Sequence, residues 1–262
     1  MCELFGISSN YPIAASQELN EFRLRGGQVA NNPDGWGLAW RENGTFRLFK
    51  EPIAAHQSAL FAQLCGTTRS SLVIAHVRKA TFPLIKDMSN THPFQRECCG
   101  KEWVFAHNGM VPDIVDIELS KNNLVCCPNG KTDSEYAFCH LLDHIAQHYY
   151  CLPSPDPIAW FENLATVSGL VASLGKFNFL MSEGKHLIAY GHDRLHYLER
   201  SSSGQLDGSP VTVNSALVAT EPPDDNEKWT AFEPGELRLY HSGRMMWRMV
   251  TQTMPPYGTV LK

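Results

Sequence analysis

The chain has 262 residues, of which 43% are hydrophobic and 19% charged, and its formal net charge is −5. These proportions are typical of a globular protein with a substantial core, organised as one large domain or two small ones. The negative charge and the lack of a Lys/Arg cluster argue against nucleic-acid binding. No apolar run approaches the roughly 18 residues of a membrane span, and no secretory signal is visible, so we expect a cytoplasmic protein that does not bind membranes.

The chain contains eight cysteines. They are Cys2, Cys65, Cys98, Cys99, Cys126, Cys127, Cys139 and Cys151. In a cytosolic chain of this size we expect their thiols to be reduced. The adjacent pairs Cys98-Cys99 and Cys126-Cys127 lack the C-x-x-C spacing of a zinc knuckle. We interpret them as packing or surface residues, and we expect no metal site and no cofactor.

Hydrophobic periodicity and turn residues predict alternating strands and helices in the first half of the chain. Expected strands cover Leu4–Ile7, Trp36–Trp40, Thr45–Lys50, Ser71–Val77 and Trp103–Ala106. Expected helices cover Ser16–Leu24, with Ser16 as a candidate N-cap, Ala54–Leu64 and Asp133–His148. The sequence Asn43-Gly44 predicts a tight hairpin turn. The segment Thr81–Arg96 is long and irregular, and such loops in compact chains are often functional.

The second half is predicted to be rich in strands. A helix is expected over Ile158–Ser173, followed by strands at Phe177–Ser182, His186–Tyr190, Leu195–Glu199, Val211–Ala219, Glu236–Tyr240 and Met245–Val250. Strands at both ends of the chain, helices between them and hairpin connections favour an α+β fold with antiparallel sheets.

The N-terminal stretch MCELFGI carries a cysteine in a special position. An initiator methionine before a small residue is normally removed, which would leave Cys2 with a free α-amine. That amine has a pKa of about 7.7–8 and could act as the base for the thiol of the same residue. The apolar run after it predicts a buried strand that would hold the terminus inside the fold. The alternative is a cysteine in a frayed terminus.

Polar motifs lie at the ends of three further predicted elements. HVRKAT at 76–81 and AHNG at 106–109 each follow a strand, and GKTDSE at 130–135 opens a helix. Functional sites are commonly built at such positions. Each motif also has a plain explanation, with Arg78 as a surface residue, Asn108-Gly109 as a turn and Asp133 as a helix cap.

Taken together, the motifs resemble those of the class II glutamine amidotransferases, which are N-terminal-nucleophile (Ntn) hydrolases. The resemblance rests on MCELFG at 1–6, DGWG at 34–37, HVR at 76–78, NTHP at 90–93, HNG at 107–109 and TDSE at 132–135. These motifs are most similar to those of the stand-alone YafJ-like branch of the family.

The resemblance implies a four-layer αββα sandwich of two mainly antiparallel sheets. It also implies a single glutamine amidotransferase domain over residues 2–262, with the motifs within 2–135 and residues 158–262 completing the sandwich. The implied fold agrees with the α+β class expected from the order of the elements.

The resemblance further implies three catalytic residues. The Cys2 sulfur would attack the side-chain amide of glutamine, while its own α-amine takes and returns the proton. The side-chain N–H of Asn108 and the backbone N–H of Gly109 would form the oxyanion hole.

Four more residues are implied to bind the substrate. The planar guanidinium of Arg78 would hold the α-carboxylate of glutamine. Asp133 would pair with the α-ammonium, and Thr81 and His92 would line the same pocket.

We therefore predict an enzyme that releases ammonia from glutamine through a Cys2 thioester. No nucleotide-binding motif and no synthase domain are visible, so ammonia would go to a separate synthase or be the end product. One alternative is a γ-glutamyl amidohydrolase that acts on a peptide-like thiol metabolite with the same residues. Another is a non-catalytic glutamine-binding module.

Three histidines, His140, His144 and His148, share one face of the predicted helix at i, i+4 and i+8. Two histidines at this spacing can bind a metal, but metal sites normally add a carboxylate or cysteine. We favour a polar helix face over a metal-binding protein.

Overall fold

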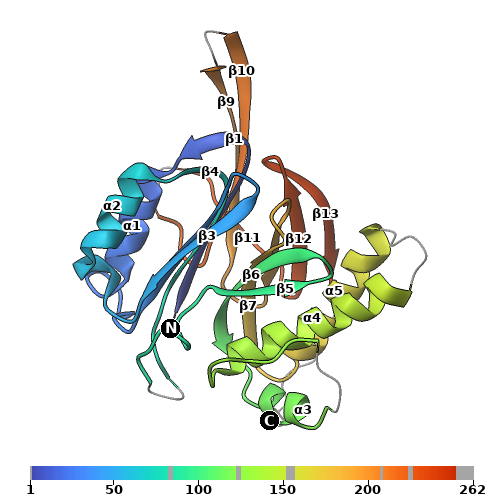
Figure 1. The fold of residues 1–262 in the computed structure, drawn as a ribbon. Coiled ribbons are helices and arrows are strands. Elements are labelled where there is room, and N and C mark those ends of the chain that lie inside the picture. The colour runs from blue at the N-terminus through green and yellow to red at the C-terminus, as the bar shows by residue number, and fades with distance from the viewer. Residues whose placement is uncertain are drawn as a thin grey trace, which may run out of the picture.

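The structure is a computed structural model that describes residues 2–81, 85–121, 125–151, 157–206, 209–223 and 227–251. The side chains at 148–151, 157–159 and 206 fall outside that description. Two sheets lie between two layers of helices (Figure 1). None of the described helices is long and apolar enough to cross a membrane.

The first sheet holds the N-terminal strand in its middle. Within the described residues it has seven strands in the order β11-β9-β10-β1-β4-β2-β3. They are β1 (Glu3–Ala14), β2 (Trp36–Glu42), β3 (Thr45–Glu51), β4 (Arg69–Val77), β9 (His196–Leu206), β10 (Ser209–Ala219) and β11 (Thr230–Ala231). The start of β1 pairs with β4 on one edge and with β10 on the other, both antiparallel. The segment just after Cys2 is therefore fixed on both sides.

The second sheet carries the HNG motif. Its described part has six strands in the order β13-β12-β8-β7-β6-β5. They are β5 (Phe94–Cys98), β6 (Lys101–Met110), β7 (Lys176–Ser182), β8 (Leu187–Gly191), β12 (Glu236–His241) and β13 (Arg244–Val250). β6 pairs antiparallel with β7, which places Asn108 opposite Asn178. A strand from the second half of the chain thus lies directly beside the motif.

Helices cover the outer faces of both sheets. The first sheet is covered by α1 (Ser16–Arg25), the short 3-10 helix η1 (Ala55–Gln57) and α2 (Ala59–Thr67). The second is covered by α4 (Asp133–Cys151) and α5 (Pro157–Ala172), and α3 (Ile114–Leu119) contacts α4. Figure 1 shows α1 and α2 on one side of the molecule and α4 and α5 on the other.

Buried apolar side chains fill each space between the layers. Successive residues of β1 point to opposite faces, so Phe5 packs with Leu19 of α1, whereas Leu4 packs with Leu180 between the two sheets. Phe138 of α4 lies in a third cluster with the outer face of the second sheet. Because the first half of β1 is buried on both faces, its residues Leu4–Ile7 form a continuous apolar run. The three clusters confirm the predicted αββα sandwich.

Several element boundaries differ from the prediction. β6 continues to Met110, so residues 107–109 lie inside a strand rather than in a turn after it. The helix expected over Ala54–Leu64 divides at Ser58, whose hydroxyl caps α2 by accepting the Phe61 N–H at 2.9 Å. Ser16 is not a cap, because α1 begins after Ala15 without a side-chain cap bond. The structure also adds α3, β5 and β11.

The expectation that every cysteine is reduced is wrong for Cys126 and Cys139, which form a disulfide. The loop before α4 folds back on the helix and brings the two Cα atoms to 5.0 Å, a separation that a disulfide can span. Cys98 is buried beside Cys99, and Cys127 is exposed, in line with packing and surface roles.

The histidine face of α4 is partly used for side-chain contacts. His140 Nδ1 lies 2.5 Å from a carboxylate oxygen of Glu118, and its ring centroid is 4.8 Å from that of His144. The His148 side chain falls outside the described residues. In the part of the chain that the structure describes, no group of three His, Cys, Asp or Glu side chains is arranged to hold a metal.

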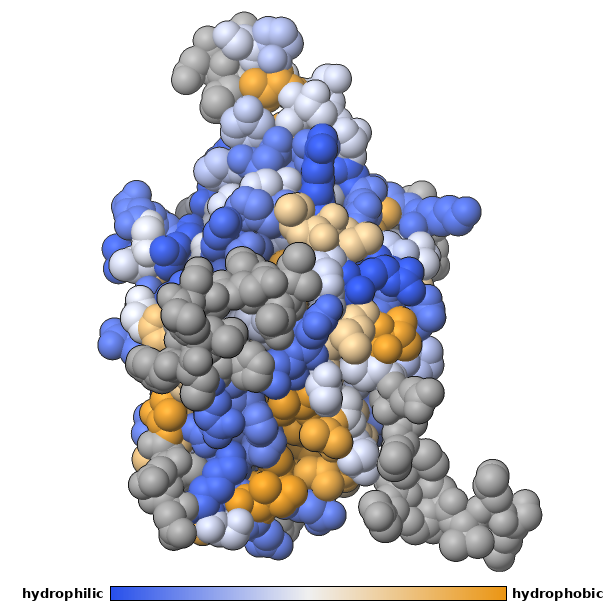
Figure 2. All heavy atoms as spheres, turned by 90° about the vertical axis from the view of Figure 1, so that its right-hand side faces the viewer, coloured by the Kyte–Doolittle hydropathy of each residue, from blue (hydrophilic) through white to orange (hydrophobic). Residues whose placement is uncertain are grey.

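The face that carries α5 and β13 is mostly hydrophilic, with hydrophobic residues gathered in its lower part (Figure 2). Among the exposed apolar side chains of the second sheet and its helix layer are Leu119 of α3, Leu170 of α5 and Met246 of β13. They lie on the helix layer and an edge strand, away from the start of β1 (Figure 1).

Candidate active site

Cys2 directly precedes β1 and lines a small cavity of about 30 Å³. The cavity is formed by Cys2, Arg78, Lys79, Ala80, Thr81, His92, His107, Gly109, Thr132, Asp133 and Ser134. This set contains every predicted site residue except Asn108, whose side-chain amide donates to the Cys2 carbonyl oxygen. The fold therefore brings all the predicted residues together around one thiol.

The Cys2 thiol is held by the loop after β4. Its Sγ accepts the Lys79 N–H at 3.2 Å and lies 3.4 Å from the Lys79 carbonyl oxygen, to which the thiol can donate. Burial raises the pKa of Cys2, although the Lys79 N–H and the charge of Arg78 act in the lowering direction. The thiol is therefore protonated at neutral pH, and its attack on a carbonyl carbon needs a base.

The DGWG motif braces this loop from behind. The Asp34 N–H donates to the Arg78 carbonyl at 2.9 Å, and the Asp34 carboxylate accepts the Ala80 N–H at 2.9 Å. At Gly37, a Cβ atom would lie 2.1 Å from the His92 carbonyl oxygen, so only glycine lets the two segments approach. The motif thus shapes the cavity, although its residues do not line it.

Asn108 and Gly109 reach the site from the second sheet. Asn108 is buried, and its Nδ2 donates to the Cys2 carbonyl and lies 3.4 Å from Thr220 Oγ1. A Cβ atom at Gly109 would lie 1.8 Å from the Lys176 carbonyl oxygen, so the pairing of β6 with β7 requires glycine here. Two N–H donors of different kinds, a side-chain amide and a main-chain amide, are thus adjacent along β6 beside the nucleophile.

Arg78 brings a buried positive charge to the cavity. Its side chain is 3% exposed, and Nη1 donates to the Ile85 carbonyl at 2.7 Å. Within the described residues no carboxylate forms an ion pair with this guanidinium, while Asp34 and Asp87 act on it at longer range. A buried cation that lacks a paired anion is costly, and it suits a site that receives a carboxylate.

Asp133 brings a negative charge to the same cavity. It is the first residue of α4, where its two oxygens accept the Val111 N–H at 2.7 Å and the Ser134 N–H at 2.8 Å. The helix cap is Thr132, whose hydroxyl accepts the Glu135 N–H at 3.3 Å. In the described chain Asp133 forms no ion pair, so its charge is available to a cation in the cavity.

Two buried imidazoles, of His92 and His107, line the cavity, and the ring of His76 packs against His92 behind it. Burial lowers the pKa of His76 to about 3 and also lowers the pKa values of His92 and His107. His107 Nε2 donates to the Lys176 carbonyl at 3.2 Å, so its Nδ1 accepts from the Ser134 hydroxyl at 2.8 Å. At neutral pH these rings supply no positive charge that would stabilise a thiolate.

The two remaining predicted residues line the cavity in different ways. Thr81 is exposed and belongs to the rim. His92 is buried, and both of its ring nitrogens lack a partner within the described residues. An unpartnered buried nitrogen is costly, so His92 is a candidate to meet a polar group of a ligand.

The sequence reasoning missed two polar residues from the second half of the chain. Thr220 follows β10, and its hydroxyl accepts the Leu4 N–H at 2.9 Å. Asn178 lies in β7, and its Nδ2 donates to the Asn108 carbonyl at 3.1 Å. No motif marks either residue, and the available signal is a polar residue inside or just after a buried strand.

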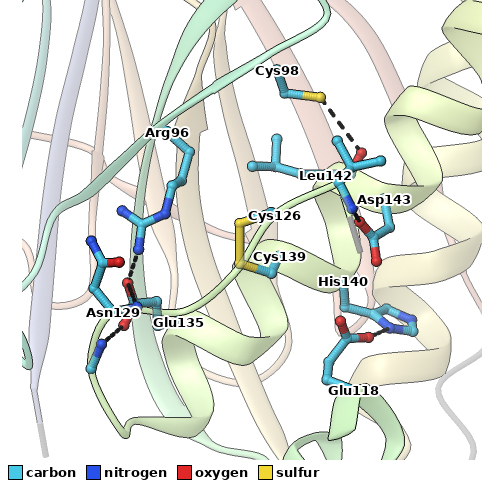
Figure 3. Close-up of a disulfide and its surroundings, with 12 residues drawn as sticks. Arg96, Cys98, Glu118, Cys126, Asn129, Glu135, Cys139, His140, Leu142 and Asp143 are labelled. Carbon is cyan, nitrogen blue, oxygen red and sulfur yellow. Dashed lines mark hydrogen bonds and ion pairs between the residues drawn. A yellow bond between two sulfur atoms is a disulfide. The ribbon is translucent and has the colours of Figure 1, made fainter. Parts of the chain in front are cut away.

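The loop that leads into Asp133 is tied to its surroundings by ionic and covalent links (Figure 3). Glu135 of α4 forms an ion pair with Arg96 of β5 and accepts the Asn129 N–H at 3.0 Å. The disulfide between Cys126 and Cys139 joins the same loop to the side of the helix. These links fix the start of α4, and with it the Asp133 carboxylate.

A family model described as class II glutamine amidotransferases matches residues 1–258. The chain belongs to this family. Escherichia coli YafJ, whose name describes a glutamine amidotransferase, is 33% identical over 258 residues, which cover 93% of this chain and 98% of YafJ. A crystal structure of a predicted glutamine amidotransferase from Pseudomonas aeruginosa matches with a TM-score of 0.67 and 30% identity, covering 94% of this chain and 100% of that one.

This class II glutamine amidotransferase is also similar to a named hydrolase. The γ-glutamyl-hercynylcysteine sulfoxide hydrolase of Mycobacterium tuberculosis is 27% identical over 200 residues, which cover 76% of this chain and 71% of the hydrolase. The comparisons confirm the predicted family and enzyme class, and membership implies glutamine or a γ-glutamyl compound as the substrate.

Proposed function

We propose that this enzyme hydrolyses the side-chain amide of glutamine and releases ammonia through a thioester on Cys2. One observation carries the proposal. The cavity that Cys2 lines also contains a guanidinium and a carboxylate, from Arg78 and Asp133, that are not ion-paired within the described residues. A free amino acid presents the complementary charges, an α-carboxylate and an α-ammonium, and glutamine adds an amide carbon within reach of a nucleophile.

The base in this proposal is the α-amine of Cys2, exposed when Met1 is removed. The raised pKa of the Cys2 thiol means that a proton must leave sulfur during the attack. The imidazoles around the cavity are poor candidates for this step. The two ring nitrogens of His107 already bond to Ser134 and Lys176, and the pKa of His92 is far below neutrality.

The proposed reaction begins at the Cys2 thiol. The Cys2 sulfur bonds to the amide carbon, and the thiol proton moves to the α-amine. The oxyanion is stabilised by the amide of Asn108 and the N–H of Gly109. The C–N bond breaks as the α-ammonium of Cys2 gives its proton to the leaving nitrogen, so ammonia leaves and a thioester remains. Water then attacks the thioester carbon and gives a proton to the Cys2 α-amine, which passes it to sulfur as the C–S bond breaks, so glutamate is released and the Cys2 thiol is regenerated.

Substrate entry requires a shift of the loop after β4, because the Ile85 carbonyl of that loop contacts Arg78. A cavity of about 30 Å³ has room for about one water molecule. In this state the carbonyl of Ile85 occupies the guanidinium of Arg78. We expect the substrate carboxylate to replace that carbonyl. Released ammonia then passes to a separate synthase or is the end product.

A second candidate is a γ-glutamyl amidohydrolase for a larger amide. A hollow of about 550 Å³, lined by Met110, Pro112, Val115, Asp116, Lys131 and Asp133, adjoins the catalytic cavity at Asp133. This volume and its apolar wall leave space for a group larger than glutamine. The similarity to the named γ-glutamyl hydrolase also favours hydrolysis of a larger γ-glutamyl amide.

The test is glutamate release from glutamine, glutathione and other γ-glutamyl amides, measured on protein whose intact mass shows Cys2 as the first residue. We expect release from at least one of these amides and none from a Cys2→Ala variant. A matched control is Cys127→Ala, because Cys127 is exposed and lies outside the cavity. Protein that binds glutamine without turnover would contradict the proposal and support a binding module.

A further inference from the structure

Thr220 joins the two halves of the candidate catalytic machinery. The residue is fully buried and directly follows β10. Its hydroxyl oxygen accepts the Leu4 N–H at 2.9 Å, and its own N–H donates to the Leu4 carbonyl at 3.0 Å. Both main-chain groups of Leu4, two residues after the nucleophile, are therefore bonded to this one residue.

The same oxygen also faces the second sheet. Asn108 Nδ2 lies 3.4 Å from Thr220 Oγ1, and a hydroxyl oxygen has two lone pairs, so it can accept both donors. A side-chain amide carries two hydrogens. One of those of Asn108 goes to the Cys2 carbonyl, and the other faces Thr220. The hydroxyl is thus a bridge between the strand that carries the nucleophile and the amide that would bind the oxyanion.

The orientation of the Asn108 side-chain amide depends on the hydrogen bonds that its Nδ2 donates. Its Oδ1 is buried and has no partner among the described residues. Without the Thr220 oxygen, the Leu4 N–H and one N–H of the Asn108 amide would both lack their acceptor. Rotation that turns the unpartnered Asn108 Oδ1 toward the Leu4 N–H would relieve this loss and move Nδ2 away from the oxyanion.

We propose that Thr220 is a positioning residue that holds the Asn108 amide and the Cys2 strand in register for oxyanion stabilisation. The long contact to Asn108 fits this role, because a weak bond in the resting state can be exchanged at little cost for a stronger bond to a developing oxyanion. The inference rests on the proposed Cys2 hydrolysis.

The test compares Thr220→Val, which keeps the shape and removes the oxygen, with Thr220→Ser, which keeps the oxygen. We expect kcat to fall about tenfold or more in Thr220→Val with KM nearly unchanged, and Thr220→Ser to retain most of kcat. Alkylation of Cys2 by iodoacetamide, followed by peptide mass spectrometry, should be similar in all three proteins, because that reaction forms no oxyanion.

The matched control is Ser70→Ala. Ser70 is buried in the same sheet, and its hydroxyl accepts the Leu72 N–H at 3.1 Å far along β4 from the cavity. This variant should lose thermal stability and keep kcat. If Thr220→Val does not fold, Thr220→Ala removes the same oxygen and must show the same loss of kcat.

Two results would overturn the inference. One is an unchanged kcat in the variants that lack the oxygen, and the other is an equal loss in Thr220→Ser. Failure of the proposed function looks different, because the unaltered protein would then release no glutamate from any γ-glutamyl amide.

Discussion

Replacement of Asp133 by asparagine perturbs both the proposed substrate contact and the start of α4. The carboxylate accepts two main-chain N–H groups, from Val111 at 2.7 Å and Ser134 at 2.8 Å, and it lines the cavity at the start of α4. Asparagine keeps one acceptor oxygen, removes the negative charge and turns an NH₂ group toward the second N–H. One variant therefore tests both the stability of the fold and the proposed contact with the substrate α-ammonium.

A hydrogen bond between charged groups contributes about 1.5–3 kcal/mol, and about 1.4 kcal/mol is a factor of ten in affinity. We therefore expect Asp133→Asn to raise KM for glutamine about 10- to 100-fold and to change kcat little. The lost main-chain bond and the lost charge at the helix N-terminus should together lower the free energy of unfolding by about 1–3 kcal/mol.

Glutaramic acid, which is glutamine without its α-amino group, provides the decisive assay. If Asp133 holds the α-ammonium, the unaltered enzyme should use glutaramic acid poorly, and Asp133→Asn should lower kcat/KM for glutamine much more than for glutaramic acid. Asp113→Asn serves as the control, since Asp113 is an exposed acid at the N-cap of α3 without a side-chain cap bond. An equal loss for both substrates would mean that Asp133 supports only the structure.

Three further predictions concern other residues of the cavity. Asn108→Ala should lower kcat at least about tenfold with little change in KM, since an oxyanion donor acts mainly in the transition state; a raised KM with an unchanged kcat would refute that role. Arg78→Lys keeps the charge but loses the planar guanidinium that can bind a carboxylate with two hydrogen bonds, so steady-state kinetics should show a higher KM. Mild effects of both Arg78→Lys and Arg78→Ala would place the carboxylate site elsewhere. Cys2→Ser should fold and bind substrate yet lose nearly all turnover. Activity across preparations should follow the fraction of chains that start at Cys2 in intact-mass spectra. Full activity with Met1 retained would exclude the α-amine as the base.

Local patterns predicted much of the fold. The apolar run after Cys2 is a buried strand because both of its faces meet a core, and the helix expected from Asp133 begins at that residue, with Thr132 as its cap. The strand expected over Leu195–Glu199 runs on to Leu206 instead. Its serine-rich continuation has weak strand propensity, but pairing with β10 along its whole length overrides that preference.

The candidate site was predictable where its residues form contiguous motifs. Arg78, Asn108 and Asp133 stand in short polar runs beside buried elements, so each is visible in the sequence. Thr220 and the partner cysteines Cys126 and Cys139 are different, because their roles depend on neighbours that are distant in sequence or brought together by a folded loop. Such contacts follow from the register of strands and the path of loops, which single-residue patterns do not determine.

The disulfide has a consequence for handling the protein. Cys126 and Cys139 are 5% and 0% exposed, whereas the Cys2 sulfur borders a cavity. Thiol–disulfide exchange requires access to a sulfur atom, so a reductant reaches the buried bond only when the loop before α4 opens locally. A short exposure to a mild monothiol should therefore restore an oxidised Cys2 and leave the cross-link in place. Prolonged incubation with a strong dithiol would remove both, and activities measured after the two treatments would belong to two covalently different proteins.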